Sequence, residues 1–248
     1  MPKFFVTPDK IIDNHIIIDT DDAAHITRVL RLGAGDRITV CDSRGNDYDA
    51  EIMEIETGRV ICNITEKKAS VSEPNIKVTL FQGLPKASKM EYIIQKTTEL
   101  GISEIVPVKM SRCVVKIDNK KDEKKKLDRW RKISEAAAKQ SGRGIVPEIS
   151  EIMSIDEVIE QSKHFDLFFV PYECEEKKTL KEALLSRPDI TSVGFLIGPE
   201  GGFDIGEAKK LHENDIATVT LGKRILRTET AGEAVLAMAM YEIGDING

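Results

Sequence analysis

The stretch Phe195-Leu196-Ile197-Gly198-Pro199-Glu200-Gly201-Gly202-Phe203 is the most informative part of this 248-residue chain. The apolar run at residues 193–197 is typical of a buried strand, and the glycines and proline after it predict a tight turn before a helix at 205–214. An ordinary strand-to-helix turn needs one glycine, whereas several glycines beside a proline also let a ligand approach the backbone. The stretch therefore predicts a buried strand followed by a ligand-binding loop. It matches neither the dinucleotide-binding nor the phosphate-loop glycine pattern.

The segments around this stretch alternate between strands and helices. We expect strands at residues 76–82, 105–108, 167–170 and 218–221, and helices at 88–100, 122–140, 177–185 and 230–243. Repeated β–α units with apolar strands indicate an α/β fold, with a mostly parallel sheet covered on both faces. Such sheets bind ligands beyond the carboxyl ends of their strands.

The N-terminal part of the chain has a different pattern. We expect short alternating strands at residues 3–7, 15–19, 36–42, 48–55 and 59–65. One helix is predicted between them, from about Asp21 to Leu32, with Thr20 as its N-cap and the glycines of 33–35 at its end. Short strands joined by tight turns predict a small β-barrel. The polar residues 66–75 mark a boundary, so we expect two domains, 1–70 and 75–248.

Composition restricts the class of protein. Hydrophobic residues make up 41% and charged residues 31%, which excludes collagen and disordered chains. No apolar run approaches the about 20 residues of a membrane-spanning helix, and the first residues lack a signal-peptide core. The four cysteines form no Cys-x-x-Cys pair, so no zinc site is expected and a reducing compartment is favoured. We therefore expect a cytoplasmic protein without a membrane segment or a metal.

Charge is distributed unevenly along the chain. The net charge is −6, yet residues 109–143 hold 13 basic and 5 acidic side chains, whereas residues 144–248 hold 10 and 20. A basic segment within an acidic protein is the usual electrostatic footprint for a polyanion such as RNA or DNA. A solvated helix face explains the same charges equally well.

A second motif spans residues 220–232, Thr-Leu-Gly-Lys-Arg-Ile-Leu-Arg-Thr-Glu-Thr-Ala-Gly. A short strand ends at Gly222, and an apolar helix starts a few residues later, capped by Thr228 or Thr230. The loop between them sets two apolar side chains between two arginines at 224–227. Such a loop could hold an adenine and a carboxylate. A surface loop with solvated arginines is an equally good interpretation.

These motifs belong to a resemblance that covers nearly the whole chain. They are HITRVLR at 25–31, QGLPK at 82–86, QKTTELG at 95–101, SRCVVK at 111–116, EAAAKQSGR at 135–143, GPEGG at 198–202 and LGKRILRTETA at 221–231. In these residues the sequence resembles the RsmE family of SPOUT-class RNA methyltransferases. It departs from that pattern at Lys3, where Arg is frequent, and at Lys139, where Glu is common.

The resemblance implies a PUA-like N-terminal β-barrel and a C-terminal α/β methyltransferase domain with a trefoil knot. It also implies a homodimer that methylates N3 of one uridine in 16S rRNA, in the decoding region of the small ribosomal subunit. The methyl donor implied is S-adenosylmethionine, and no metal is implied.

The resemblance and the two loops together suggest site residues. The expected cofactor-binding residues are Phe169, Val170, Pro171, Gly198, Pro199, Glu200, Gly201, Leu221, Gly222, Ile225, Leu226, Thr230 and Ala231. Arg227 is expected to stabilise negative charge on the uracil oxygens. Glu229 is a candidate base, as is Glu200, although either could instead orient a loop. The expected RNA-binding residues are Lys3, Arg28, Arg31, Arg112, Lys116, Arg129 and Arg143.

Two other classes of protein compete with this interpretation. One is a small-molecule transferase that uses a different nucleotide, which the missing phosphate-loop motifs argue against. The other is a non-enzymatic RNA-binding assembly protein of the same fold. The intact loops at 198–202 and 221–231 argue against a non-enzymatic protein.

Overall fold

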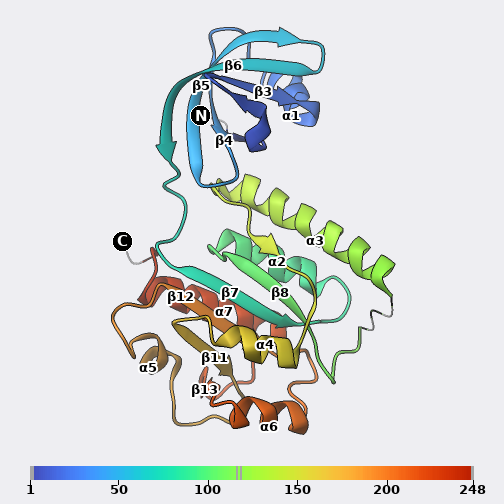
Figure 1. The fold of residues 1–248 in the computed structure, drawn as a ribbon, viewed down its shortest axis with the longest axis vertical. Coiled ribbons are helices and arrows are strands. Elements are labelled where there is room, and N and C mark those ends of the chain that lie inside the picture. The colour runs from blue at the N-terminus through green and yellow to red at the C-terminus, as the bar shows by residue number, and fades with distance from the viewer. Residues whose placement is uncertain (1–2, 116, 118, 247–248) are drawn as a thin grey trace. The chain divides into compact units, whose positions relative to one another are not determined.

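The computed structural model describes residues 3–115, 117 and 119–246 (Figure 1). Two compact units are present. One comprises Met1–Glu73 and Ala138–Val146, and the other comprises Pro74–Ala137 and Pro147–Gly248. The segment 138–146 thus belongs with the N-terminal residues, although nothing in the local sequence pattern indicated that it would.

The N-terminal unit is built on a six-stranded sheet of order β1-β4-β5-β6-β3-β2. Its strands are β1 Lys3–Phe5, β2 Ile11–Ile12, β3 His15–Asp19, β4 Arg37–Cys41, β5 Asn46–Glu56 and β6 Arg59–Ala69. All pairs are antiparallel except β1 with β4. Among the described residues β1 and β2 are not paired with each other, so the sheet is an open barrel. One core cluster fills it, with Ile16, Ile18, Ile38 and Val40 fully buried.

The prediction of a single helix at residues 21–32 is wrong. Helix α1 covers only Thr20–Ala24, with Asp19 rather than Thr20 as its N-cap, and a π-helical turn follows at His25–Val29. The Leu30 amide donates to the His25 carbonyl at 3.0 Å, which closes the wide turn. The segment ends at Arg31, whose φ of 56° is left-handed, and not at the glycines of 33–35.

The C-terminal unit holds a parallel sheet of order β10-β8-β7-β12-β11-β13, with β9 beside β8. Its strands are β7 Lys77–Gly83, β8 Glu104–Lys109, β9 Glu148–Ile149, β10 Met153–Ser154, β11 Leu167–Pro171, β12 Ser192–Ile197 and β13 Ala217–Val219. Its helices are α2 Lys89–Glu99, α3 Lys120–Ser141, α4 Ile155–Ser162, α5 Leu180–Leu184, α6 Ile205–Glu213 and α7 Thr228–Glu242. Every strand pair in this sheet is parallel, as predicted.

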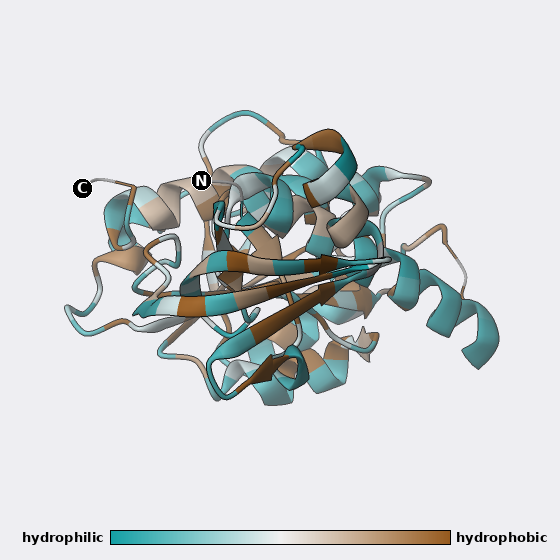
Figure 2. Cartoon of the chain, turned by 90° about the horizontal axis from the view of Figure 1, so that it is seen from above, coloured by the Kyte–Doolittle hydropathy of each residue, from teal (hydrophilic) through white to brown (hydrophobic). Residues whose placement is uncertain are grey.

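Two core clusters cover the two faces of this sheet. Leu80 of β7 packs in the cluster that includes α2, α3, α5 and α7, and its neighbour Phe81 packs in the cluster that includes α4 and α6. Neighbouring residues of a strand point to opposite faces, so a strand buried on both sides is apolar throughout. In Figure 2 the strands nearest the viewer are banded brown, white and teal, and the helix that projects at the right is largely teal. In the part of the chain that is described, no helix is long and apolar enough to cross a bilayer.

Candidate active site

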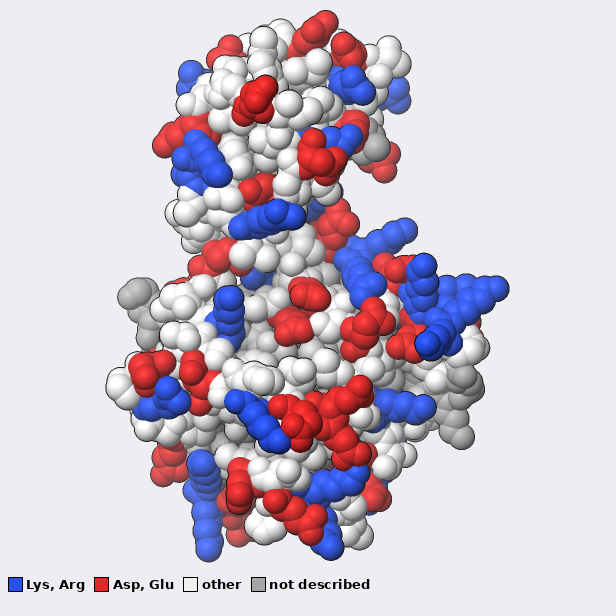
Figure 3. All heavy atoms as spheres, viewed as in Figure 1, with Lys and Arg blue, Asp and Glu red and all other residues white. Residues whose placement is uncertain are grey.

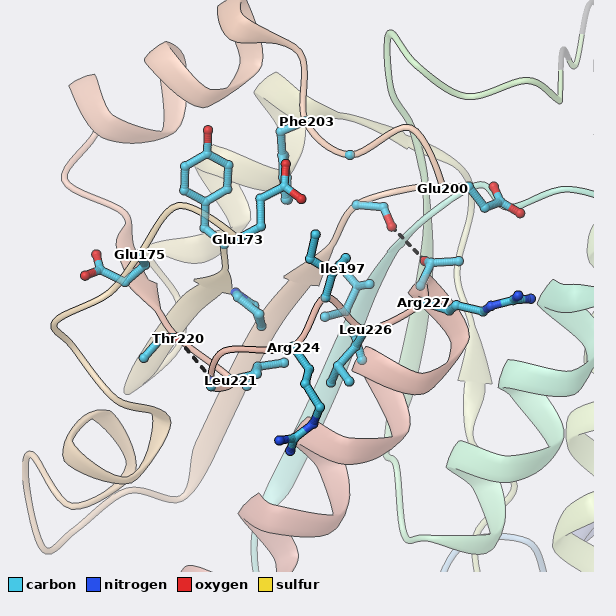
Figure 4. A pocket seen from close by; sticks show the side chains of 18 of the residues that line it. Glu173, Glu175, Ile197, Glu200, Phe203, Thr220, Leu221, Arg224, Leu226 and Arg227 are labelled. Carbon is cyan, nitrogen blue, oxygen red and sulfur yellow. Dashed lines mark hydrogen bonds between the residues drawn. The ribbon is translucent and has the colours of Figure 1, made fainter.

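A cavity of about 980 Å³ opens at the carboxyl ends of β12, β11 and β13 in the C-terminal unit (Figure 4). Its walls are the segments that follow these three strands, together with Lys89 and the start of α7. They contribute residues from 171–176, 197–203 and 220–228. The carboxyl edge of a parallel sheet is where α/β proteins bind ligands, and the volume suits a small molecule.

The glycine-rich loop after β12 is held closely by its neighbours. A Cβ at Gly201 would lie 3.0 Å from the Arg112 Cβ and 3.3 Å from the Arg112 carbonyl oxygen. The Arg112 guanidinium in turn donates to the Gly201 carbonyl at 3.0 Å. Gly202 has a φ of 66°, which is left-handed and favours glycine. The loop therefore needs these glycines for its own conformation and packing, whether or not a ligand approaches its backbone.

A buried hydrogen-bond relay fixes the two loops relative to the sheet. Gln82 Nε2, at the end of β7, donates to Thr228 Oγ1 at 2.9 Å, and Thr228 Oγ1 donates to the Gly198 carbonyl at 2.7 Å (Figure 4). The predicted cap of α7 is therefore wrong. Arg227 is the N-cap without a side-chain hydrogen bond, and the Thr228 hydroxyl is used by the relay instead.

Lys89 of α2 lies between two carboxylates. Its Nζ is 3.2 Å from Glu200 Oε1 and 3.1 Å from Glu229 Oε2. Burial alone would raise the pKa of both carboxyls, but hydrogen bonds from backbone amides and from Lys89 outweigh it and lower both pKa values. The hydrogen bond to Glu229 raises the pKa of Lys89 in return. Carboxyls with lowered pKa values stay ionised and are weak bases at neutral pH.

The loop after β13 supplies apolar side chains and backbone donors. Gly222 has a φ of 95°, and its amide donates to Thr220 Oγ1 at 3.2 Å. The backbone amides of 223–226 donate no hydrogen bond to any group that the structure describes. Ile225 is exposed at 84%, and Arg224 and Arg227 leave the loop in different directions (Figure 4). This wall can therefore offer amide donors and an apolar surface to a ligand.

The opposite wall is acidic and was missed by the sequence analysis. Glu173, Glu175 and Glu176 line it, and Phe203 packs edge-on against Tyr172 at 6.0 Å. Glu175 accepts hydrogen bonds from Thr218 and from the amides of 177–178, which lower its pKa to about 2. The available signal was the acidic run directly after β11.

Most of the expected cofactor-binding residues line the cavity. These are Pro171, Gly198, Pro199, Glu200, Leu221, Gly222, Ile225, Leu226 and Ala231, and Arg227 lines it too. Phe169 and Val170 do not, because the interior of β11 is buried in the core and only its end reaches the cavity. Gly201, Thr230 and Glu229 are not among the lining residues either.

The expected RNA-binding residues fall into two groups. Arg28, Arg31, Arg112 and Arg129 are exposed, and the lysine-rich start of α3 forms the cluster of blue atoms at the right of Figure 3. Lys3 pairs with Asp47 at 2.9 Å, and Arg143, exposed at only 4%, pairs with Glu73. Lys116 lies outside the described residues. The ion pairs of Lys3 and Arg143 make them parts of the N-terminal unit's own framework.

None of the described residues that line the cavity is a cysteine. Cys41 and Cys62 are buried, and their burial raises each thiol pKa to about 11. The described residues contain no group of three or more His, Cys, Asp or Glu side chains arranged to hold a metal ion.

Comparison with known proteins identifies the family. Residues 72–240 match the RNA methyltransferase domain and residues 18–65 the RNA methyltransferase PUA domain. The chain is 37% identical to ribosomal RNA small subunit methyltransferase E of Bacillus subtilis, over 93% of this chain and 91% of that protein. It is 36% identical to the protein of the same name from Mesomycoplasma hyopneumoniae, over 72% and 76%.

A solved structure supports the same assignment. The crystal structure of ribosomal RNA small subunit methyltransferase E from Neisseria gonorrhoeae, bound to S-adenosylmethionine, has a TM-score of 0.83 and 29% identity, and the match covers 99% of each chain. The predicted fold class, a PUA-like domain followed by a SPOUT-class α/β methyltransferase domain, is confirmed. With both domains matched in order, the chain belongs to the RNA methyltransferase family of the ribosomal RNA small subunit methyltransferase E proteins.

Proposed function

We propose that this protein methylates N3 of a uridine in 16S rRNA, in the decoding region of the small ribosomal subunit. The observation that carries the proposal is the cavity at the carboxyl ends of β12, β11 and β13, lined by the loops at 198–203 and 220–228. The names of the relatives support a small-subunit rRNA substrate. The uridine and its N3 position follow from the family resemblance in the sequence motifs.

S-adenosylmethionine is the cofactor, as the N. gonorrhoeae relative indicates, and the groups that line the cavity fit it. Leu221, Ile225 and Leu226 offer apolar contacts for the adenine, and the amides of 223–226 offer donors. The carboxylates of 173–176 can face its positive charges, and Arg224 can face its carboxylate. When bound, the cofactor supplies a methyl group on a cationic sulfur that is open to in-line attack.

The roles of the charged residues follow from their partners. We assign Arg227 to the uracil carbonyl oxygens, where it stabilises the negative charge that develops as the N3 proton passes to solvent water. Glu229 and Glu200 are ionised partners of Lys89 and act as positioning residues instead of bases. Gly201 and Thr230 support the cofactor site from outside its lining.

Several exposed cations are proposed to bind RNA phosphates. These are Arg28 and Arg31 in the N-terminal unit and Arg112, Arg129 and the lysines of α3 in the other unit. Lys3 and Arg143 have structural roles under this proposal, because their ion-paired side chains are exposed at only 16% and 5%. Arg112 and Arg129 also have carboxylate partners, but their side chains stay exposed at 45% and 68%. Each phosphate contact adds to affinity and to its salt dependence.

We also propose a homodimer in the cytoplasm, where ribosomes are assembled. Helices α2 and α7 pack against each other, and their outer faces expose Tyr92, Met238 and Tyr241, the last at 60%. Exposed apolar side chains on neighbouring helices are typical of an interface between subunits. Light scattering on the wild type and on Tyr241→Glu tests this assignment, since the variant should shift toward monomer.

Small ribosomal subunits from cells that lack this protein provide the test of function. We expect purified protein and methyl-labelled S-adenosylmethionine to place label in 3-methyluridine at one 16S rRNA site, mapped by nucleoside mass spectrometry. Label in another nucleoside would contradict the uridine assignment. Cofactor binding without transfer to subunits or to free 16S rRNA would contradict the substrate, and no cofactor binding would favour an assembly protein.

A further inference from the structure

Four consecutive residues of the N-terminal unit, Arg28-Val29-Leu30-Arg31, are exposed together, and we call them the arginine tip. Val29 is exposed at 65% and Leu30 at 37%. Both are large apolar residues that most folds would bury. Among the residues that the structure describes, neither Arg28 nor Arg31 has an ion-pair partner. The tip therefore presents an apolar surface between two unneutralised cations.

The backbone holds the arginine tip in a costly conformation. Arg31 has a φ of 56°, at a helix end where glycine is the usual residue. A side chain in this left-handed region costs about 1 kcal/mol relative to glycine. The turn before it is π-helical, a rare form that is frequent at functional sites. Strain that persists in a fold points to a function for the residue that bears it.

The base of the tip is anchored in the core. Ile26 is fully buried, Leu32 packs against the same cluster, and the Leu32 amide donates to the Ile26 carbonyl at 3.0 Å. These contacts fix the two ends of the segment between them. The exposed side chains therefore lie on a turn whose two ends are fixed by the core.

The chemistry of the tip fits an unpaired nucleotide. A base or a ribose offers an apolar surface, and the phosphates on either side of it are anionic, which matches two apolar side chains between two guanidiniums. In a duplex the base faces are stacked and hidden, so only phosphates would remain for the tip. The lysine-rich start of α3 differs in this respect, because its exposed residues are almost all charged.

We propose that the arginine tip grips a single-stranded segment of RNA, with Val29 and Leu30 against one unpaired nucleotide and Arg28 and Arg31 on the phosphates beside it. The inference rests on the proposed function and deepens it. Under this proposal the N-terminal unit selects unpaired RNA and does not only attract phosphates through its positive charge.

The first test separates function from stability at Arg31. Arg31→Gly removes the cation and relieves the left-handed strain, so we expect an equal or higher Tm together with weaker binding of a single-stranded 16S rRNA fragment. The slope of log Kd against log salt concentration should fall by about one, which is the change expected when one phosphate contact is lost. Arg31→Lys keeps the charge and should keep the slope. A lower Tm for Arg31→Gly with unchanged RNA affinity would overturn the inference, because it would make Arg31 structural.

The second test isolates the apolar contact. We expect the double variant Val29→Ser, Leu30→Ser to weaken single-stranded binding by about tenfold, in line with the loss of two apolar contacts, with the salt slope unchanged. Met53→Ser, an equally exposed apolar position on β5, serves as the matched control and should bind normally. Equal competition by duplex and single-stranded RNA would overturn the inference. So would normal RNA affinity with impaired methylation of subunits only, which would indicate a ribosomal protein as the partner.

These binding measurements do not depend on turnover. If the wild type binds RNA and the tip variants bind it less, but no variant transfers a methyl group, the proposed reaction fails and the tip inference stands. If methyl transfer occurs normally in all tip variants and binding is unchanged, the proposed function stands and the tip inference fails. The two failures are therefore distinguishable.

Discussion

Replacing Thr228 with Val tests whether the buried relay organises the cofactor site. Valine has nearly the same shape but no hydroxyl, so the Gly198 carbonyl loses its 2.7 Å donor and Gln82 Nε2 loses its 2.9 Å acceptor. Thr228 and Gln82 are both buried. The change therefore acts on hydrogen bonding and leaves packing almost intact.

The expected loss of unfolding free energy depends on which hydrogen bonds Gln82 and Gly198 keep in the variant. A buried polar group left without its partner costs about 1–3 kcal/mol. Gln82 Nε2 keeps one N–H bonded to the Gly83 carbonyl, but its other N–H loses its acceptor in a fully buried position and carries most of the loss. The Gly198 carbonyl is only half-buried, at the wall of the cavity. We expect the free energy of unfolding to fall by about 2 kcal/mol. For a domain of this size, Tm should fall by about 4–8 °C.

The assay combines thermal unfolding with titration calorimetry of S-adenosylmethionine. The Kd should rise several-fold, because Gly198 and Leu226 both line the cavity and the relay fixes the segments that carry them. Thr228→Ser keeps the hydroxyl and should restore both values, and Thr57→Val, at an exposed turn, controls for the substitution itself. A Thr228→Val protein with wild-type Tm and wild-type Kd would refute the relay as an organiser of the site.

Two further changes address charged groups of the same unit. Lys89→Met removes the cation between Glu200 and Glu229, so the pKa of both carboxyls should rise and the Kd for S-adenosylmethionine should increase at pH 7. An unchanged Kd in calorimetry would exclude Lys89 from positioning. Hydrogen bonds from residues 191–192 lower the pKa of Asp166 from its ordinary value of 3.8 to about 2. The ionised Asp166 therefore stabilises the fold fully above pH 3.8, and this stabilisation is lost as the pH falls through 2. Asp166→Asn should therefore lower Tm at neutral pH, with a difference that shrinks as the pH falls from 4 to 2; a constant difference would contradict this linkage.

The parallel sheet was predictable because its signals are local. An apolar strand that ends in glycine and proline marks β12 within one residue. In the N-terminal sheet, alternation likewise marks β3 with its observed ends. Helix α4 was missed although Ser154 and Glu157 form a capping box before an apolar stretch, a pattern that can be read from sequence. Strands β9 and β10 have two residues each, which is too short for any periodicity to appear.

Sequence alone could not separate the two kinds of arginine. Arg143 and Arg28 both lie in motifs with neighbouring polar residues, yet Arg143 is buried against Glu73, 70 residues earlier, and Arg28 is exposed. A charge that serves a buried ion pair and a charge that serves a phosphate differ only in what lies opposite, which a local pattern does not contain. The acidic run at 173–176 is visible in the sequence, but the loops that it faces across the cavity follow other strands, so its place in the site is not.

Under the proposed uracil methylation, the arrangement around Lys89 bears on where the N3 proton can go. Glu200 lies in the glycine-rich loop and Glu229 at the start of α7, and hydrogen bonds from backbone amides and from Lys89 together lower the pKa of both. A base with a lowered pKa takes a proton from a weak acid poorly. Under the proposed function, catalysis depends on alignment of donor and acceptor and on the charge of Arg227, which we propose lowers the cost of the developing anion. Alignment requires fixed backbone positions, and the buried relay from Gln82 through Thr228 to Gly198 supplies them where the two loops meet the sheet.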